Sequence, residues 1–306
     1  MSRARRAAIR PARRATTGAA LRAAIVVLAS VLSSACATSQ SRMSRALEPS
    51  MERVLVTETY LRTVTGLSSY PERLMRNDGY VYVADVAPVM RYYADRGDTL
   101  QYLRLRSYMM LNLMRRDAAG FTLGRRFRAG QEFERARPDE YSGTRRALLE
   151  GWQALGDTTS ATVLAQLVPV PQPESPAASA QYQLSVDCAD ALELVSADPA
   201  PARAVLTRAR ALVGRDRGGE AGQRVVGATA SDDEVDLLAC LTRAGVALND
   251  PDASVRYLDR MLSRLQPFLA HSGRTDLGTG ADVLLTLHRV REAGPAWSLP
   301  PARGAR

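Results

Sequence analysis

Apolar residues recur every three to four positions through most of the chain, which is the spacing of amphipathic α-helices. The pattern predicts an all-α fold. It places ten helices at roughly 48–65, 79–96, 99–115, 139–155, 158–168, 180–197, 200–214, 232–249, 252–269 and 277–293.

Four short turns join these helices in pairs. Each turn has a small or turn-tolerant residue that ends one helix, followed by an Asp placed to cap the next. The four are Asp98, Asp157, Asp198 and Asp250, spaced 59, 41 and 52 residues apart. Pro199 and Pro251 follow two of them, at the position where a helix tolerates proline best. The spacing predicts repeated helical hairpins with connections of variable length.

This repeat gives the fold a polarity. Because paired helices run antiparallel, the tight turns gather at one end and the long connections at the other. The long connections are residues 116–138, 169–179, 215–231 and 270–276. Loops on a rigid scaffold often carry function, so we expect any site on this rim. Within the first connection, residues 120–128 alternate partly and contain glycine, which predicts a small β-hairpin.

The N-terminus has the pattern of an export signal. A basic stretch leads into a short apolar run at 23–32, and small residues then precede Cys36. Ten apolar residues are too few to span a bilayer, whereas a secretory signal has this order. The segment resembles a bacterial lipoprotein signal, in which the cysteine carries the lipid. Plain secretion and a twin-arginine signal at Arg13 and Arg14 are the alternatives.

These assignments give the domain organisation. We expect a signal peptide at 1–35, a flexible tether at 36–48, a helical domain at 49–298 and a disordered tail at 299–306. Ala37 follows the cysteine, and a residue other than Asp there is typical of an outer-membrane lipoprotein facing the periplasm. The predicted localisation is therefore export, with a lipid anchor in the membrane.

The charge of the chain concentrates in the signal. The formal net charge is +9, and all 41 cationic residues are Arg. Seven of them lie in residues 1–35, which contain no acid, so the remaining chain has a net charge of only +2. A near-neutral exported body does not favour nucleic-acid binding.

Two cysteines occupy equivalent positions in successive hairpins. Cys188 lies ten residues before Asp198, and Cys240 lies ten residues before Asp250. The pair could be oxidised in an exported protein, or both could be buried small residues. The two histidines, His271 and His288, lie outside the common zinc motifs. We therefore predict no metal, and the absence of a phosphate-binding glycine motif predicts no cofactor.

Two segments suggest a family. Residues 140–157 (EYSGTRRALLEGWQALGD) resemble the hairpins of six-hairpin glycosidases, and residues 77–85 (NDGYVYVAD) are similar to a stretch in the cellulase-like members. The resemblance implies an α/α toroid of about five to six hairpins. It also implies a pair of carboxylates acting as general acid and base on a glycan.

The resemblance selects the candidate site residues. Asp78, Asp85 and Glu140 match the catalytic carboxylates, and four aromatic residues could stack on sugar, namely Tyr80, Tyr82, Tyr141 and Trp152. Acids near helix N-termini also serve as caps. Asp85 stands among apolar neighbours and could instead be paired with an Arg. Trp152 could equally be a core residue.

The predicted function is thus an exported, lipid-anchored envelope protein that binds or hydrolyses a carbohydrate. The alternative is a non-catalytic helical scaffold of tetratricopeptide type, supported by the segment 234–269. Protein partners stay unidentified. The two interpretations differ in shape, since a closed ring brings residues 49–65 against 277–293 and an open solenoid keeps them apart.

Overall fold

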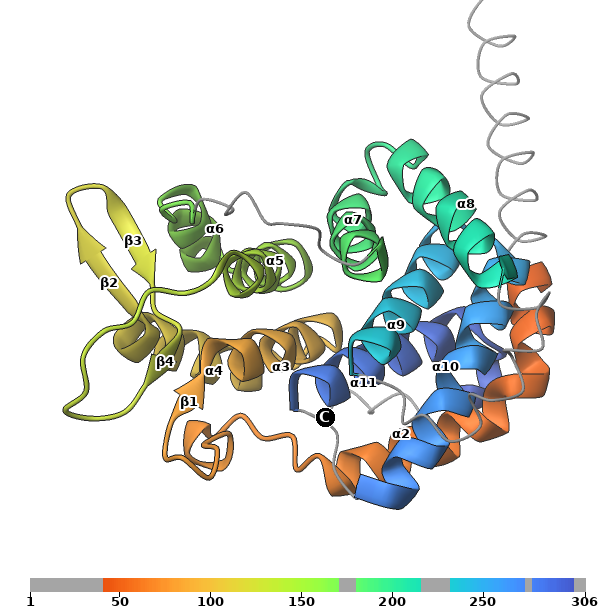
Figure 1. The fold of residues 1–306 in the computed structure, drawn as a ribbon, viewed down its shortest axis with the longest axis horizontal. Coiled ribbons are helices and arrows are strands. Elements are labelled where there is room, and N and C mark those ends of the chain that lie inside the picture. Colours follow the sequence, from red (N-terminus) through yellow and green to blue (C-terminus); the bar gives the residue numbers. More distant parts are fainter. Residues whose placement is uncertain (1–40, 171–179, 216–231, 273–276, 300–306) are drawn as a thin grey trace, which may run out of the picture. The chain divides into compact units, whose positions relative to one another are not determined.

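The protein is described by a computed structural model over residues 41–170, 180–215, 232–272 and 277–299. Each of the ten predicted helices is present in this part of the chain (Figure 1). Their bounds are α2 Met51–Val64, α3 Val83–Asp95, α4 Thr99–Tyr108, α5 Pro138–Leu155, α6 Thr158–Ala165, α7 Ala180–Leu194, α8 Ala200–Arg215, α9 Asp232–Ala247, α10 Pro251–Ser272 and α11 Leu277–Ala293. The all-α fold class predicted from the sequence is confirmed.

Contacts and ion pairs link five of these helices in succession, and we call this set the inner ring (α3, α5, α7, α9 and α11). Helix α3 packs against α5 and α11, and α9 packs against α7 and α11. Ion pairs from Arg145 to Glu193 and from Arg146 to Asp190 link α5 to α7. Helices α4, α6, α8 and α10 each pack on the inner helix before them in the chain, so every inner helix except α11 starts a hairpin.

The first outer helix contacts the last inner helix. Helix α2 packs against α11, the last inner helix. The guanidinium of Arg291 on α11 forms a buried ion pair with the carboxylate of Glu58 on α2. The segments that an open solenoid would hold apart, residues 49–65 and 277–293, are therefore in contact.

In three of the four tight turns, a turn-tolerant residue ends the first helix as predicted. Gly97, Gly156 and Asn249 all have positive φ angles, between 51° and 68°, which is the left-handed conformation that ends a helix. Among the Asp caps, Asp198 accepts the N–H of Ala200, and Asp250 accepts the N–H of Ala253.

The capping prediction is wrong for the other two turns. Asp98 and Asp157 accept no side-chain capping bond from their helices. Both are engaged elsewhere: Asp98 lies 3.6 Å from Arg96, and Asp157 accepts two hydrogen bonds from Arg106. An arginine within reach offers the carboxylate a charge-assisted bond, which is stronger than one from a neutral N–H.

The β-strands near the first long connection differ in position and pairing from the hairpin predicted at residues 120–128. Strands β2 (Met114–Asp117) and β3 (Gly120–Leu123) form the hairpin, so its first strand precedes the predicted range. Asp117 accepts the N–H groups of Ala119 and Gly120 and thereby builds the turn. Strand β4 (Arg126–Phe127) pairs instead with β1 (Val81–Tyr82). Helix α3 consequently begins at Val83, four residues later than predicted.

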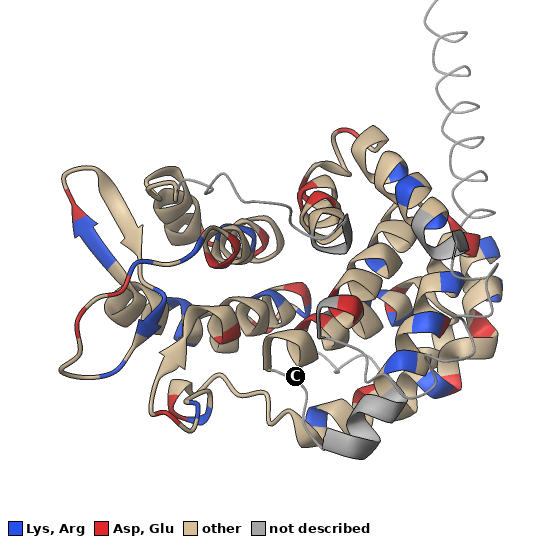
Figure 2. Ribbon diagram, viewed as in Figure 1, with Lys and Arg blue, Asp and Glu red and all other residues tan. Residues whose placement is uncertain are grey.

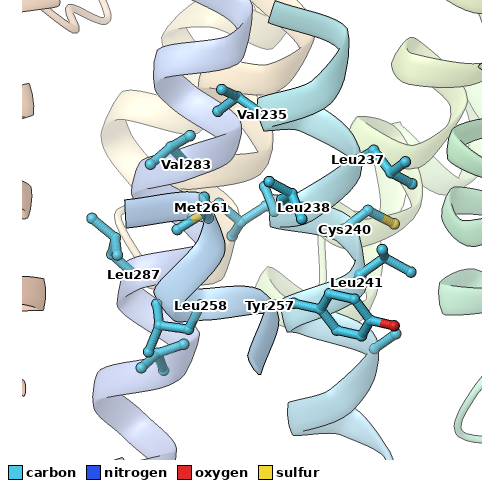
Figure 3. Close-up of a cluster of buried hydrophobic side chains, with 14 of the residues drawn as sticks. Val235, Leu237, Leu238, Cys240, Leu241, Tyr257, Leu258, Met261, Val283 and Leu287 are labelled. Atoms are coloured by element: carbon cyan, nitrogen blue, oxygen red, sulfur yellow. The ribbon is translucent and has the colours of Figure 1, made fainter. Parts of the chain in front are cut away.

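Two hydrophobic clusters fill the unit formed by Met43–Arg306. One lies among α7 to α11 and α2, where Val235 and Leu238 of α9 face Val283 of α11 and Met261 of α10 (Figure 3). A disulfide joins Cys188 of α7 to Cys240 of α9 in this cluster, with 6.3 Å between the Cα atoms. The equivalent spacing of the two cysteines had left this pairing as one of two alternatives.

The ends of the domain also differ from the prediction. Residues 43–47 are helical, and Met43 and Leu47 are buried, so the C-terminal part of the expected tether belongs to the core. The side chain of Met43 is apolar, so its removal from water lowers the free energy of the folded state. The signal peptide, Cys36 and residues 300–306 of the tail lie outside the described residues. Among the described helices, none combines the length and apolar character needed to span a bilayer.

Candidate functional site

A central cavity of about 960 Å³ lies inside the inner ring. All five inner helices contribute to its wall, and α5 and α7 contribute the most residues. Pockets that bind small molecules have volumes of about 300–1,000 Å³. The cavity is therefore large enough for a small-molecule ligand.

A polar stripe on α5 faces this cavity. Five residues at spacings of three and four line the wall, namely Asp139, Ser142, Arg146, Glu150 and Gln153. This spacing places them on one face of a helix. The opposite side of α5 carries Ala147, Leu148 and Gly151, which are buried. Asp139 and Gln153, at the two ends of the stripe, are exposed, whereas Ser142, Arg146 and Glu150 between them are partly buried, so the stripe offers polar groups both at the edge of the cavity and inside it.

Charged side chains from three other inner helices meet the stripe. Arg91 of α3 donates to Glu150 at 2.9 Å and to Asp282 of α11 at 3.2 Å. Arg243 of α9 lies 3.5 Å from the same Asp282 carboxylate oxygen and donates to the Asp282 carbonyl at 3.0 Å. Although burial by itself would raise it, Arg243 and Arg91 hold the pKa of Asp282 below its usual range. Acidic and basic segments both occur on α3 and α5 (Figure 2).

Arg146 is less well paired than Arg91, Arg243 and Arg289, the other cavity arginines that form ion pairs. Its shortest ion pair is to Asp190, at 3.6 Å, and its Nε has no hydrogen-bond partner among the described residues. Only 17% of the side chain is exposed. Burial and repulsion from Arg91 lower the pKa of Arg146. A covered guanidinium with so little compensation is costly unless something else binds it.

The residues predicted from the resemblance gather elsewhere, around the ladder of β1 and β4. Asp78 is exposed and accepts the N–H of Tyr80 at 3.0 Å and the hydroxyl of Tyr82 at 2.6 Å. These two bonds lower the pKa of Asp78. The rings of Tyr80 and Tyr82 lie 6.2 Å apart, and Arg126 stacks over Tyr80.

Asp85 is fully buried in the first turn of α3. Both of its carboxylate oxygens accept from the Arg76 guanidinium, at 2.7 and 2.8 Å. An arginine-paired Asp85 was one of the alternatives that the sequence allowed, and the structure shows this pairing. The same guanidinium lies 4.6 Å from the Tyr82 ring centroid, which connects Asp85 to Asp78 through Tyr82.

Glu140 caps the start of α5. It accepts the backbone N–H of Arg137 at 2.7 Å and pairs with Arg125 at 3.3 Å. Burial raises the pKa of Glu140. Arg125 also bonds Glu134, and Glu134 pairs with Arg126, which donates to Tyr82. The three predicted carboxylates thus belong to one network, in which each already has a partner.

The other predicted residues lie apart from this network and from the cavity wall. Tyr141 is partly buried against the second hydrophobic cluster. Trp152, near the end of α5, is 47% exposed, so it is not the core residue that the sequence allowed. Neither is among the residues that line the cavity.

A third group of ionisable residues lies where α3 and α11 end. Asp95, His288 and Glu292 bring ligand atoms within 4.8 Å of one another, a set that could hold a cation. The guanidinium of Arg289 already pairs with Asp95. This cluster was not predicted from the sequence, although His288 and Glu292 are four residues apart on one helix and would share a face.

No protein-family model, no curated protein and no solved structure matches this chain.

Proposed function

We propose that this protein is an exported, lipid-anchored envelope protein whose ten helices form an α/α toroid of five helix pairs, with α2 paired to α11, and that it binds a carbohydrate in its central cavity. The observation that carries the proposal is the 960 Å³ cavity with a polar stripe of α5 on its wall. Sugars present many hydroxyl groups, and a site for them needs donors and acceptors on a rigid frame. Helices supply both here.

Binding is favoured over hydrolysis by the state of the predicted carboxylates. A general acid or base must reach the proton that it transfers. Asp85 is fully buried and holds Arg76 with both oxygens, while Glu140 caps α5 and pairs with Arg125. The lining of the cavity holds other carboxylates, but those of Glu150 and Asp282 are bound by Arg91.

The binding proposal can be tested by calorimetry on the protein without residues 1–36. Neutral and acidic di- and trisaccharides would be titrated into the wild type and into Ser142→Trp, which fills the cavity from α5. Ser107→Trp, at an exposed position of α4, is the matched control. We expect saturable binding that Ser142→Trp abolishes and the control keeps. Absence of binding across the panel, or equal binding by both variants, would overturn the proposal.

Hydrolysis is tested with the same panel by measuring released reducing ends. We expect none. If turnover is seen, Asp78→Asn, Asp85→Asn and Glu140→Gln decide whether the predicted carboxylates catalyse it, since loss of turnover without loss of folding would assign them that role.

The proposed anchor is the lipid on Cys36, with the domain facing the periplasm from the outer membrane. The test is labelling of the full chain with a radioactive fatty acid during expression. Incorporation that disappears in Cys36→Ser supports the anchor, and incorporation of no label by the wild type contradicts it.

A further inference from the structure

We infer that the ligand of the central cavity carries a carboxylate, which binds the guanidinium of Arg146. This inference rests on the proposed function and adds to it the chemical class of the sugar, an acidic one.

Most charged groups of the wall are engaged by other residues. Arg91 binds both Glu150 and Asp282, Arg243 binds Asp282, and Arg289 pairs with Asp95. The carboxylate of Glu193 is taken by Arg145. Arg146 is the exception among these cavity arginines, because its closest acid, Asp190, stands 3.6 Å away and is itself 61% exposed.

The guanidinium of Arg146 therefore has hydrogen-bond donors to offer inside the ring. Its Nε is buried and has no acceptor among the described residues. A guanidinium presents its N–H groups as a planar fork that matches the two oxygens of a carboxylate. The positive charge of nearby Arg91 lowers the pKa of Arg146. A bound carboxylate would offset the repulsion between these two guanidinium groups.

A second group on the stripe suits the hydroxyls of a sugar. Glu150 lies one helical turn beyond Arg146, and its Oε2 is buried with no hydrogen-bond partner in the described part of the chain. A carboxylate oxygen accepts bonds from hydroxyl groups. An acidic sugar offers both a carboxylate for Arg146 and hydroxyls for Glu150, whereas a neutral sugar offers only the second.

The experiment compares trigalacturonate, a neutral trisaccharide such as cellotriose, and the dicarboxylate adipate by calorimetry at constant ionic strength. The variants are Arg146→Gln and the control Arg208→Gln, which makes the same charge change on the outer helix α8, away from the cavity wall. Arg146→Gln removes one charge-assisted pair, so we expect it to weaken trigalacturonate binding on the order of 10- to 100-fold. Arg208→Gln should leave binding unchanged.

The outcomes distinguish an acidic ligand from carbohydrate binding in general. Binding of the neutral sugar as tight as that of trigalacturonate would overturn the acidic ligand and leave carbohydrate binding standing. Equal loss in both variants would also overturn the role of Arg146. Adipate bound as tightly as trigalacturonate would keep the carboxylate and remove the carbohydrate. Circular dichroism of Arg146→Gln confirms that any loss of binding is not a loss of fold.

Discussion

Glu58 and Arg291 are 233 residues apart in the chain, and their side chains form a buried ion pair between α2 and α11. Arg291 also donates to the carbonyl of Ser298 at 2.9 Å, so one guanidinium ties together the first outer helix, the last inner helix and the segment after it. The pair therefore joins the two ends of the described helical domain.

Arg291→Met is expected to lower the free energy of unfolding by about 3 kcal/mol, because it leaves the buried Glu58 carboxylate without its main partner. Arg62 also pairs with Glu58 and keeps the loss from being larger. The measurement is urea denaturation followed by circular dichroism. Arg53→Met is the matched control, since Arg53 and Asp259 form an exposed pair that should be worth less than about 1 kcal/mol. A loss no greater than that of the control would contradict a role for Arg291 in joining the two ends of the described helical domain.

Reduction of the Cys188–Cys240 disulfide is expected to destabilise the domain. The bond closes a loop with a sequence separation of 52, and loop-closure entropy at this length corresponds to about 4 kcal/mol. The measurement is urea denaturation of the protein without residues 1–36, with and without reductant. The double variant Cys188→Ala and Cys240→Ala should respond to reductant by no measurable amount. A wild type equally indifferent to reductant would show that the cysteines are not bonded in solution.

The helices were predictable because their signals are local. Apolar spacing located all ten, and Gly97, Gly156 and Asn249 ended three of them as expected. Strand β1 was not predictable in this way, because Val81 and Tyr82 continue the apolar pattern of α3 and form a strand only by pairing with β4, some 45 residues later.

The candidate site was less predictable, since its residues are defined by which face of a helix turns inward. In the sequence the polar stripe of α5 looks like an ordinary solvated face, and only the packing of the neighbouring helices places it on the wall of a cavity. Pairing of Asp85 with an arginine was one of the expected alternatives. Which arginine it pairs with could not be predicted, because Arg76 is placed by the loop before β1. Pairing of acids with arginines is a tertiary property, and a single sequence in which every cation is Arg offers many possible partners.

Gly151→Ala is expected to destabilise the protein by more than 1 kcal/mol. A Cβ at Gly151 would lie 1.8 Å from the Tyr102 hydroxyl, which is held by Ser160, so α4 and α5 would have to separate. Gly143→Ala, in the same helix with open space around it, is the control and should instead stabilise by about 0.5–1 kcal/mol. Thermal unfolding of both variants measures the difference, and changes of the same sign would contradict the close approach.

Burial raises the pKa of Asp95 to about 7. The groups that face it are Arg289, His288 and Glu292 of α11, Glu150 of α5 and Arg243 of α9. Between about pH 4 and pH 7 the folded protein holds a proton on Asp95 that the unfolded chain has released. The free energy of unfolding should therefore fall as the pH rises through this window, and the loss should be complete above pH 7.

Asp95→Asn replaces the carboxylate with a neutral group of the same shape and should abolish this loss. We expect the variant to match the wild type near pH 4 and to exceed its stability at pH 8 by at least about 1 kcal/mol, since each pKa unit corresponds to about 1.4 kcal/mol. Urea denaturation at the two pH values measures it, with Glu132→Gln, an exposed loop position, as the control for a lost acid. A variant less stable than the wild type at pH 8 would show that the ion pair with Arg289 outweighs the cost of burying the charge, and the predicted pH dependence would then be wrong.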